Sequence, residues 1–98
     1  MTIELTHLDP VIHAPKRLAA MAILANATHA EFGFLREHLD ISDSDLSKQM
    51  ATLEKAAYVS VSKSGHGRGG VTTYRITKQG KAAFERHVAA LRAITQGA

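Results

Sequence analysis

The stretch SDSDLSKQMATLEKAAYVSVSKSGHGRGGVTTYRIT, residues 42 to 77, decides the fold of this 98-residue chain. Ser42, with Asp45 three positions later, is typical of a capped helix start, and the helix is predicted to run to about Ala57. Alternating valine and serine at 59 to 62 predict a strand, glycine-rich residues 65 to 70 predict a loop, and the β-branched and aromatic run 71 to 77 predicts a second strand. The predicted order is therefore helix, strand, glycine tip, strand.

The glycine tip also matches the GxGxxG pattern of dinucleotide-binding proteins, through Gly65, Gly67 and Gly70. That fingerprint requires a helix directly after the glycines and an acidic residue about 20 positions further on. Here a predicted strand follows, and the next acidic residue is Glu85. The context therefore argues against a nucleotide cofactor, and no cofactor is expected.

The helix predicted after Ser42 has two different faces. Its buried stripe is predicted to consist of Leu46, Met50, Leu53 and Ala57, which have the spacing of one helical face. The opposite face is small, polar and basic, which suits contact with a polyanion. The residues predicted on that outward face are Ser44, Lys48, Ala51, Thr52 and Lys55, with Ser47 on its flank.

Two prolines precede the first predicted helix. Asp9 followed by Pro10 is a favourable start, and after Pro15 the main helix is expected from about Lys16 to Asn26. Basic residues 16 and 17 followed by apolar residues 18 to 25 imitate a signal peptide. Acidic residues upstream and the marginal length of the run favour a buried helix instead. No membrane association is expected.

A second helix is predicted immediately before Ser42. Thr28 with Glu31 forms a capping-box pattern, so this helix is expected to continue through Leu39. Because two residues separate its end from Ser42, the two helices are predicted to form a helix-turn-helix. Phe34 points away from the apolar stripe of its helix, which indicates a second covered side or a subunit contact.

The last helix is predicted to be capped by Thr77 and to run to about Thr95. Phe84, Val88 and Leu91 form an apolar stripe at helical spacing. Such a stripe can cover its own domain or pair with a second copy of the helix. Because the helix lies beyond the compact part of the chain, dimerisation through these three residues is the favoured interpretation.

Basic charge is concentrated in the second half of the chain. Residues 1 to 50 hold four Lys/Arg and seven Asp/Glu, a net charge of −3, whereas residues 51 to 98 hold eight and two, a net charge of +6. From Lys55 to Phe84 there are six cations and no acid, which is the pattern of a polyanion-binding surface. The absence of cysteine excludes disulfides and thiol chemistry and fits a cytoplasmic location.

In this order and at these spacings the residues resemble the winged-helix domain of MarR-type transcriptional regulators, in a short form with one C-terminal dimerisation helix. The chain has Asp40 and Ala57 where members of that family commonly have glycine. The residues that carry the resemblance are Phe32, Leu35, Leu39, Leu46-Ser47-Lys48-Gln49-Met50, Leu53-Glu54-Lys55-Ala56-Ala57-Tyr58-Val59, Tyr74-Arg75-Ile76-Thr77 and Gly80.

The resemblance implies one domain over residues 1 to 98, of α+β class and mainly α, with a winged-helix core at 9–77, a two-stranded wing and a dimerisation helix at 78–95. It implies a homodimer that binds a pseudo-palindromic double-stranded DNA operator, with repression as the family-level expectation and a small-molecule effector still to be identified. Hydroxyl and basic groups are expected to contact the duplex. The expected DNA-binding residues are Ser44, Ser47, Lys48, Thr52, Lys55, Lys63, His66 and Arg68.

Three alternatives compete with this interpretation. An enzyme is not expected, because no nucleophile or phosphate-loop motif is present and no two histidines have the helical spacing of a metal site. A winged helix that contacts protein or RNA is a second alternative. The third is a metal- or proton-responsive regulator in which histidines distant in sequence meet across a dimer interface, although no metal site is assigned. The histidines are at positions 7, 13, 29, 38, 66 and 87.

Overall fold

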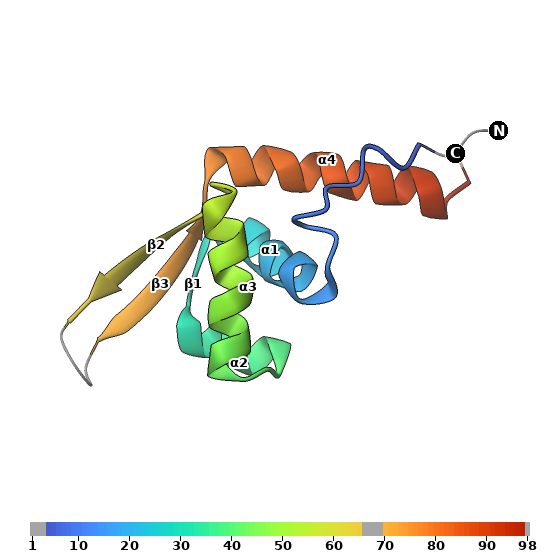
Figure 1. The fold of residues 1–98 in the computed structure, drawn as a ribbon. Helices are drawn as coiled ribbons and strands as arrows, with labels where there is room; N and C mark the ends of the chain where they lie inside the picture. Colours follow the sequence, from blue (N-terminus) through green and yellow to red (C-terminus); the bar gives the residue numbers. More distant parts are fainter. Residues whose placement is uncertain (1–3, 66–69, 98) are drawn as a thin grey trace.

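Four helices and a three-stranded antiparallel sheet make up the computed structural model, which describes residues 4 to 65 and 70 to 97 (Figure 1). This mainly helical architecture confirms the predicted winged-helix class. The elements in chain order are α1 (Pro15–Ala27), β1 (His29–Glu31), α2 (Phe32–Leu39), α3 (Asp43–Lys55), β2 (Val59–Ser64), β3 (Val71–Ile76) and α4 (Lys78–Thr95).

The sheet contains a strand that the sequence pattern did not predict. β3 is the central strand and pairs with both β2 and β1, so that Tyr74 lies opposite Val61 on one side and Ala30 on the other. The capping box predicted at Thr28 and Glu31 is wrong. Thr28 ends α1 with φ of 69°, its carbonyl accepts from the Ile76 N–H at 3.1 Å, and α2 begins only after residue 31. Pairing with a distant strand overrides the local helix signal here.

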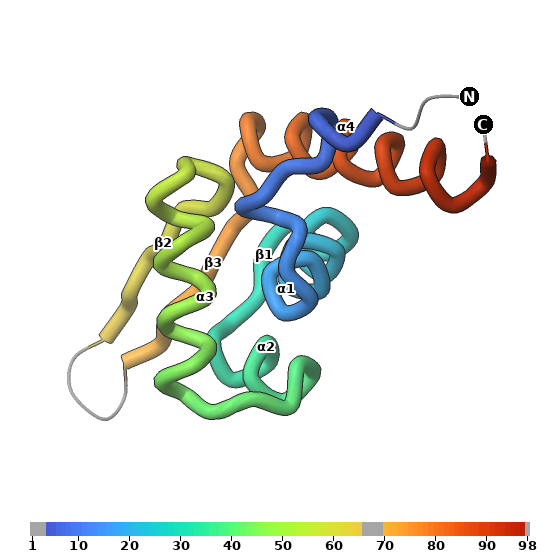
Figure 2. Tube along the Cα trace, turned by 45° about the vertical axis from the view of Figure 1, so that its right-hand side comes forward, coloured from blue at the N-terminus to red at the C-terminus, as the bar shows by residue number. Residues whose placement is uncertain are grey.

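α1 lies at the centre of the core, and α2, α3, α4, β1 and β3 pack around it (Figure 2). Its Ala20, Met21 and Leu24 are fully buried. The apolar run that imitates a signal peptide is thus a buried helix. The helix start predicted at Asp9 is wrong: Asp9 accepts the Val11 N–H at 2.9 Å in a turn, and Pro15 occupies the first turn of α1, where a missing N–H costs nothing.

α3 buries three of the four residues predicted for its stripe. Leu46, Met50 and Leu53 are fully buried, whereas Ala57 is exposed with φ of 65°, because the helix ends at Lys55. Asp40 also has positive φ, at 53°. These are the two positions where the related family commonly has glycine, and a left-handed residue with a Cβ costs about 1 kcal/mol.

Side-chain caps fix the starts of α3 and α4. The Ser42 hydroxyl accepts the Asp45 N–H at 3.1 Å, and the Thr77 hydroxyl accepts the Gly80 N–H at 2.9 Å, so both predicted caps are confirmed. Thr77 also donates its hydroxyl to the Ala57 carbonyl at 2.6 Å. One threonine therefore joins the start of α4 to the turn that follows α3.

α4 is packed against that same turn at its first helical positions. A Cβ placed on Gly80 would lie 2.0 Å from the Tyr58 carbonyl oxygen, so only glycine fits there. From this joint, where Gly80 meets Tyr58, α4 extends away from the hairpin. The N-terminal segment, residues 4 to 14, returns along α4 (Figures 1 and 2). Within the described ranges, no helix combines the length and apolar character needed to cross a membrane.

Candidate nucleic-acid interface

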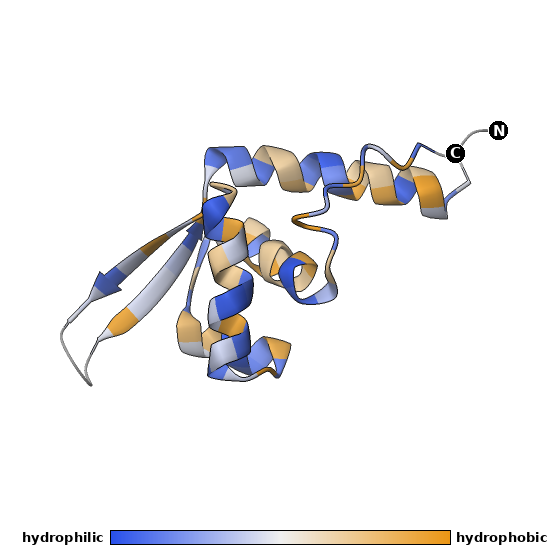
Figure 3. Ribbon diagram, viewed as in Figure 1, coloured by the Kyte–Doolittle hydropathy of each residue, from blue (hydrophilic) through white to orange (hydrophobic). Residues whose placement is uncertain are grey.

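The outward face of α3 presents the polar and basic residues predicted from the sequence. Ser44, Ser47, Lys48 and Lys55 are exposed, and Thr52 is half-buried. Figure 3 shows α3 with polar residues alternating with the apolar ones that face the core. In the described part of the chain, neither Lys48 nor Lys55 lies within ion-pair distance of a carboxylate. Both ammonium groups are therefore available to an external anion.

The two acidic residues in the first turn of α3 are each paired with a cation of another helix. Asp43 accepts from the Arg36 guanidinium of α2 at 3.0 Å, and Asp45 pairs with the Lys16 ammonium of α1. The Gln49 amide, which donates to Asp45 at 3.0 Å, and then Lys16 lower the pKa of the Asp45 carboxyl. This pairing reduces the negative charge beside the basic face.

Hydroxyl and amide groups on α3 differ in how free they are. The Thr52 hydroxyl donates to the Lys48 carbonyl at 3.3 Å, and the Ser44 hydroxyl lies 3.3 Å from that of Ser42. Gln49 is held from two sides, since it also accepts from Arg17 at 2.7 Å. Ser47 is exposed and has no hydrogen-bonded side-chain partner among the residues described. Thr52 retains acceptor capacity, whereas Gln49 is committed to the fold.

The β2–β3 hairpin forms the predicted wing beside α3 and projects away from the helical core (Figure 1). Lys63 is exposed and shares a strand face with Val59 and Val61, the face that packs toward the helices. Arg75 lies opposite Ser60 on the other face, so the two cations point to different sides of the hairpin. His66 and Arg68, predicted to contact DNA from the tip, lie outside the described residues.

The buried face of α4 is different from the stripe predicted for dimerisation. Ala83, His87 and Ala90 are buried, whereas Phe84, Val88 and Leu91 are half-buried on one flank of the helix. Phe84 packs against the core, and Val88 and Leu91 lie beyond it. Val88 and Leu91 thus extend the apolar flank of α4 beyond the core of the protomer.

His87 is a residue of interest that the sequence analysis missed. Its ring is fully buried, and its Nδ1 accepts the Asp9 N–H at 3.0 Å, while its Nε2 lies 3.4 Å from His13 Nδ1. Desolvation, and then the neighbouring His13, lower the pKa of His87. The available signal was its spacing, four residues after Ala83 and three before Ala90 on the same helical face.

Asp9 connects this buried histidine to the turn after α3. Its second carboxylate oxygen accepts from the Tyr58 hydroxyl at 2.5 Å, and this hydrogen bond is the main reason that the pKa of Tyr58 is raised. Histidines distant in sequence do meet, therefore, but within one protomer. Over residues 4–65 and 70–97, no cluster of three or more histidine, cysteine or acidic residues is placed to hold a metal ion.

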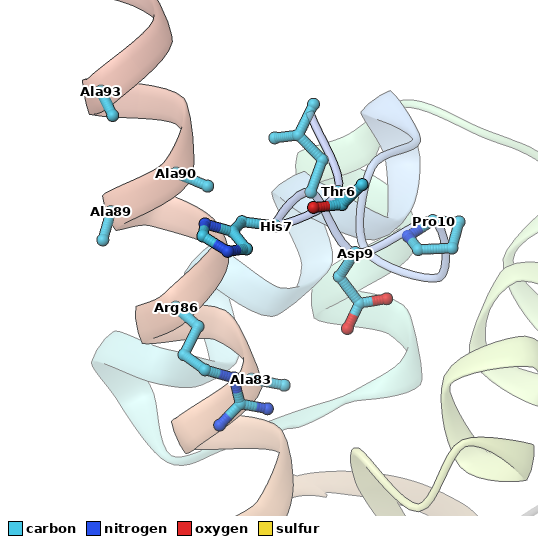
Figure 4. A pocket seen from close by; sticks show the side chains of 10 residues that line it. Thr6, His7, Asp9, Pro10, Ala83, Arg86, Ala89, Ala90 and Ala93 are labelled. Carbon is cyan, nitrogen blue, oxygen red and sulfur yellow. The ribbon is translucent and has the colours of Figure 1, made fainter. Parts of the chain in front are cut away.

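A pocket of about 710 Å³ lies between the N-terminal segment and α4 (Figure 4). Its floor is made of small alanine side chains, and Arg86 and His7 border it with polar groups. At about 100° per residue, Arg86, Ala89 and Ala93 lie on the flank of α4 opposite to Val88 and Leu91. The lining residues are Thr6, His7, Leu8, Asp9, Pro10, Ala83, Arg86, Ala89, Ala90 and Ala93.

Comparisons with known proteins agree with this architecture. A family model described as a winged helix DNA-binding domain matches residues 16–95. An uncharacterised protein of Methanocaldococcus jannaschii is 27% identical over 78 residues, covering 80% of this chain and 85% of that protein.

The fold is shared with solved structures of other proteins. A transcriptional regulator homologue from Pyrococcus horikoshii is similar with a TM-score of 0.83 and 26% identity, covering 89% of this chain and 86% of that one. The heme sensor protein PefR from Streptococcus agalactiae, in complex with heme, is similar with a TM-score of 0.76 and 20% identity, covering 90% of this chain and 61% of that one.

Proposed function

Because this chain belongs to the winged helix DNA-binding domain family, we propose that it acts as a homodimeric repressor that binds a pseudo-palindromic operator. The family and the solved structures identify it as a DNA-binding transcriptional regulator, and they confirm the MarR-type resemblance predicted from the sequence. This is not an enzyme class. The proposal assigns residues 9–77 to the DNA-binding core and 78–95 to dimerisation, in the cytoplasm, where operator DNA lies.

The observation that carries the proposal is the outward face of α3. Lys48 and Lys55 lie about two turns apart on it, both unpaired among the described residues. Asp45 and Asp43, in the first turn of α3, are paired with Lys16 and Arg36. A helix of this kind fits the major groove, where an ammonium group can bind the acceptor atoms of guanine. We assign Lys48 to a base edge and Lys55 to phosphate.

The hydroxyls of α3 have secondary roles in this assignment. Ser47 is placed to donate or accept at a base edge or a phosphate, and Ser44 and Thr52 to accept while they keep their contacts within the helix. Lys63 of the wing supplies charge to the flanking backbone, because it lies on the helix-facing side of the hairpin. The sequence adds His66 and Arg68 at the tip as further backbone or minor-groove contacts.

Dimerisation is assigned to the flank of α4 that carries Phe84, Val88 and Leu91. Val88 and Leu91 support it most strongly, since they are half-buried apolar residues outside the core of their own protomer. Two-fold symmetry would place two α3 helices in successive major grooves, about 10 base pairs apart. An operator with inverted half-sites at that spacing is therefore expected.

An unidentified small-molecule effector is assigned to the pocket between the N-terminal segment and α4. Its volume of about 710 Å³ falls within the range of small-molecule sites, and its alanine floor is apolar with Arg86 at the border. Arg86 favours an organic anion, since the Asp9 carboxylate that also lines the pocket is engaged by the Val11 N–H and the Tyr58 hydroxyl.

A thermal-shift screen of small organic acids tests this assignment: stabilisation should be lost in Ala93→Phe, which fills the pocket, and kept in Ala82→Phe, which is exposed outside it.

Selection from a random duplex library at physiological salt tests the main proposal. The expected result is an enriched motif with two inverted half-sites, retained by Lys81→Ala, which changes an exposed cation of α4. Lys48→Ala should relax the preference at one position of each half-site. Failure to enrich any motif would contradict sequence-specific DNA binding and favour the protein- or RNA-contact alternative.

A further inference from the structure

The N-terminal segment is held on α4 by one buried histidine in a defined protonation state. The Asp9 backbone N–H can only donate, so His87 Nδ1, at 3.0 Å, must be unprotonated to accept it. Neutral His87 then carries its proton on Nε2, which points to His13 Nδ1 at 3.4 Å. A second proton on His87 would place N–H against N–H and would leave a charge in a fully buried position.

The N-terminal segment also contacts the turn between α3 and β2, the first strand of the wing. Asp9 donates its backbone N–H to His87 of α4, and its carboxylate accepts from Tyr58, which lies between α3 and β2. The Tyr58 carbonyl in turn accepts the Thr77 N–H at 3.0 Å, just before α4. Asp9 thus connects the dimerisation helix with the DNA-binding core through two side chains.

The charged groups around His87 act in opposite directions. His13, from the N-terminal segment, disfavours a charge on His87, whereas Asp9 of the same segment favours it. The two cations of α1 are engaged elsewhere, Lys16 with Asp45 and Arg17 with the Val11 carbonyl and Gln49. Arg86, on α4 itself, borders the pocket and acts on Tyr58. Burial is the largest effect, and it keeps His87 neutral.

We propose that His87, Asp9 and His13 form an acid-sensitive latch, and that protonation of His87 releases the N-terminal segment from α4. As the pH falls below about 6.5, the ordinary pKa of histidine, His87 gains a proton in the released state that its buried ring cannot accommodate in the latched state. Acid therefore favours release, and neutral pH favours the latched state. The latch is a property of the protein alone and does not depend on DNA binding.

The direction of the effect follows from proton linkage. Because the pKa of His87 is lower in the latched state than in the released state, the latched state binds fewer protons, and its stability relative to release rises with pH. The stabilisation is complete above about pH 6.5, the ordinary histidine value, and decreases as the pH falls below it. At pH 5.5 the latch should open more often than at neutral pH, by up to about tenfold.

Amide hydrogen exchange of the full-length protein tests the latch without DNA. The protection factor of the Asp9 amide should fall between pH 7.5 and pH 5.5, by up to about tenfold. In His87→Gln, whose amide oxygen can accept the same N–H but does not titrate, Asp9 protection should stay constant with pH. His29→Gln, which changes an exposed histidine on β1, should behave as the wild type does.

A second variant keeps the test decisive if His87→Gln does not fold. His13→Gln changes an exposed residue and removes the neighbouring ring that lowers the pKa of His87 in the latched state, so acid should reduce Asp9 protection less than in the wild type. Asp9 protection that is independent of pH in the wild type would overturn the proposal. A fall of equal size in His87→Gln would also overturn it, as would a fall in His13→Gln as large as that of the wild type.

Discussion

α3 and α4 begin in the same way and present opposite chemistry. In each helix the capping hydroxyl accepts the N–H of the residue three positions later: Ser42 accepts from Asp45, and Thr77 accepts from Gly80. Beyond its buried stripe, α3 exposes lysine and serine, whereas α4 exposes a half-buried apolar flank with Val88 and Leu91. The difference indicates that a hydroxyl cap and a buried apolar stripe determine where a helix forms. The chemistry of its remaining face determines what the helix can bind.

The largest effect is expected where the two helices meet. Gly80→Ala would bring a Cβ to 2.0 Å from the Tyr58 carbonyl and force the joint apart, which should lower the free energy of unfolding by about 3 kcal/mol. Chemical denaturation measures the change. Gly33→Ala in α2 is the matched control, because its Cβ would meet nothing within 4 Å, and it should be neutral or slightly stabilising. If the two variants are equally stable, α4 is not tightly packed against the Tyr58 carbonyl at Gly80.

A charge on the apolar flank of α4 should separate the protomers. Val88→Asp would place an unpaired carboxylate in the proposed interface and raise the dimer dissociation constant at least roughly thirtyfold, a loss of about 2 kcal/mol. Sedimentation equilibrium measures this constant. Ala82→Asp puts the same charge on an exposed position of α4 and should leave the dimer dissociation constant unchanged. If both variants remain dimeric, the dimer does not use this flank.

The polar face of α3 should affect DNA binding without affecting assembly. Lys48→Ala should weaken binding to the selected duplex by about 2 kcal/mol, because it removes a base contact and a charge. Fluorescence anisotropy measures the affinity. Lys81→Ala, which removes an exposed cation from α4, should cost much less. Similar losses from the two variants would mean that net charge, rather than the α3 face, determines affinity.

The smallest expected effect separates folding from recognition within α3. Ser42→Ala removes the cap and should cost about 1 kcal/mol of stability, measured by thermal unfolding. Ser47→Ala, at an exposed position of the same helix, should leave stability nearly unchanged and reduce DNA affinity instead. A stability loss at Ser47 would contradict its assignment to the outward face.

Local signals in the sequence were sufficient for much of the fold. The caps at Ser42 and Thr77 and the buried positions Leu46, Met50 and Leu53 follow from spacing within one helix, and all are confirmed. β1 was missed because its only support is pairing with β3, more than 40 residues away in sequence. Distant partners leave no periodic pattern for a sequence analysis to detect.

The candidate site shows the same division. The exposed face of α3 was predictable because the buried stripe determines which residues point outward. The pairing of Asp43 with Arg36 and of Asp45 with Lys16 was not, since it depends on how three helices pack. The His87 contacts likewise require the return of the N-terminal segment along α4. The expectations for His66 and Arg68 rest on the sequence alone.

The most direct test of the contrast between α3 and α4 is one set of anisotropy titrations on the selected full-site duplex and on its isolated half-site. Lys48→Ala should lose affinity for both duplexes, because each protomer loses the same contact. Val88→Asp should lose affinity for the full site and bind the half-site as the wild-type protomer does. Equal losses of Lys48→Ala and Val88→Asp on both duplexes would contradict the assignment of DNA recognition to α3 and dimerisation to α4.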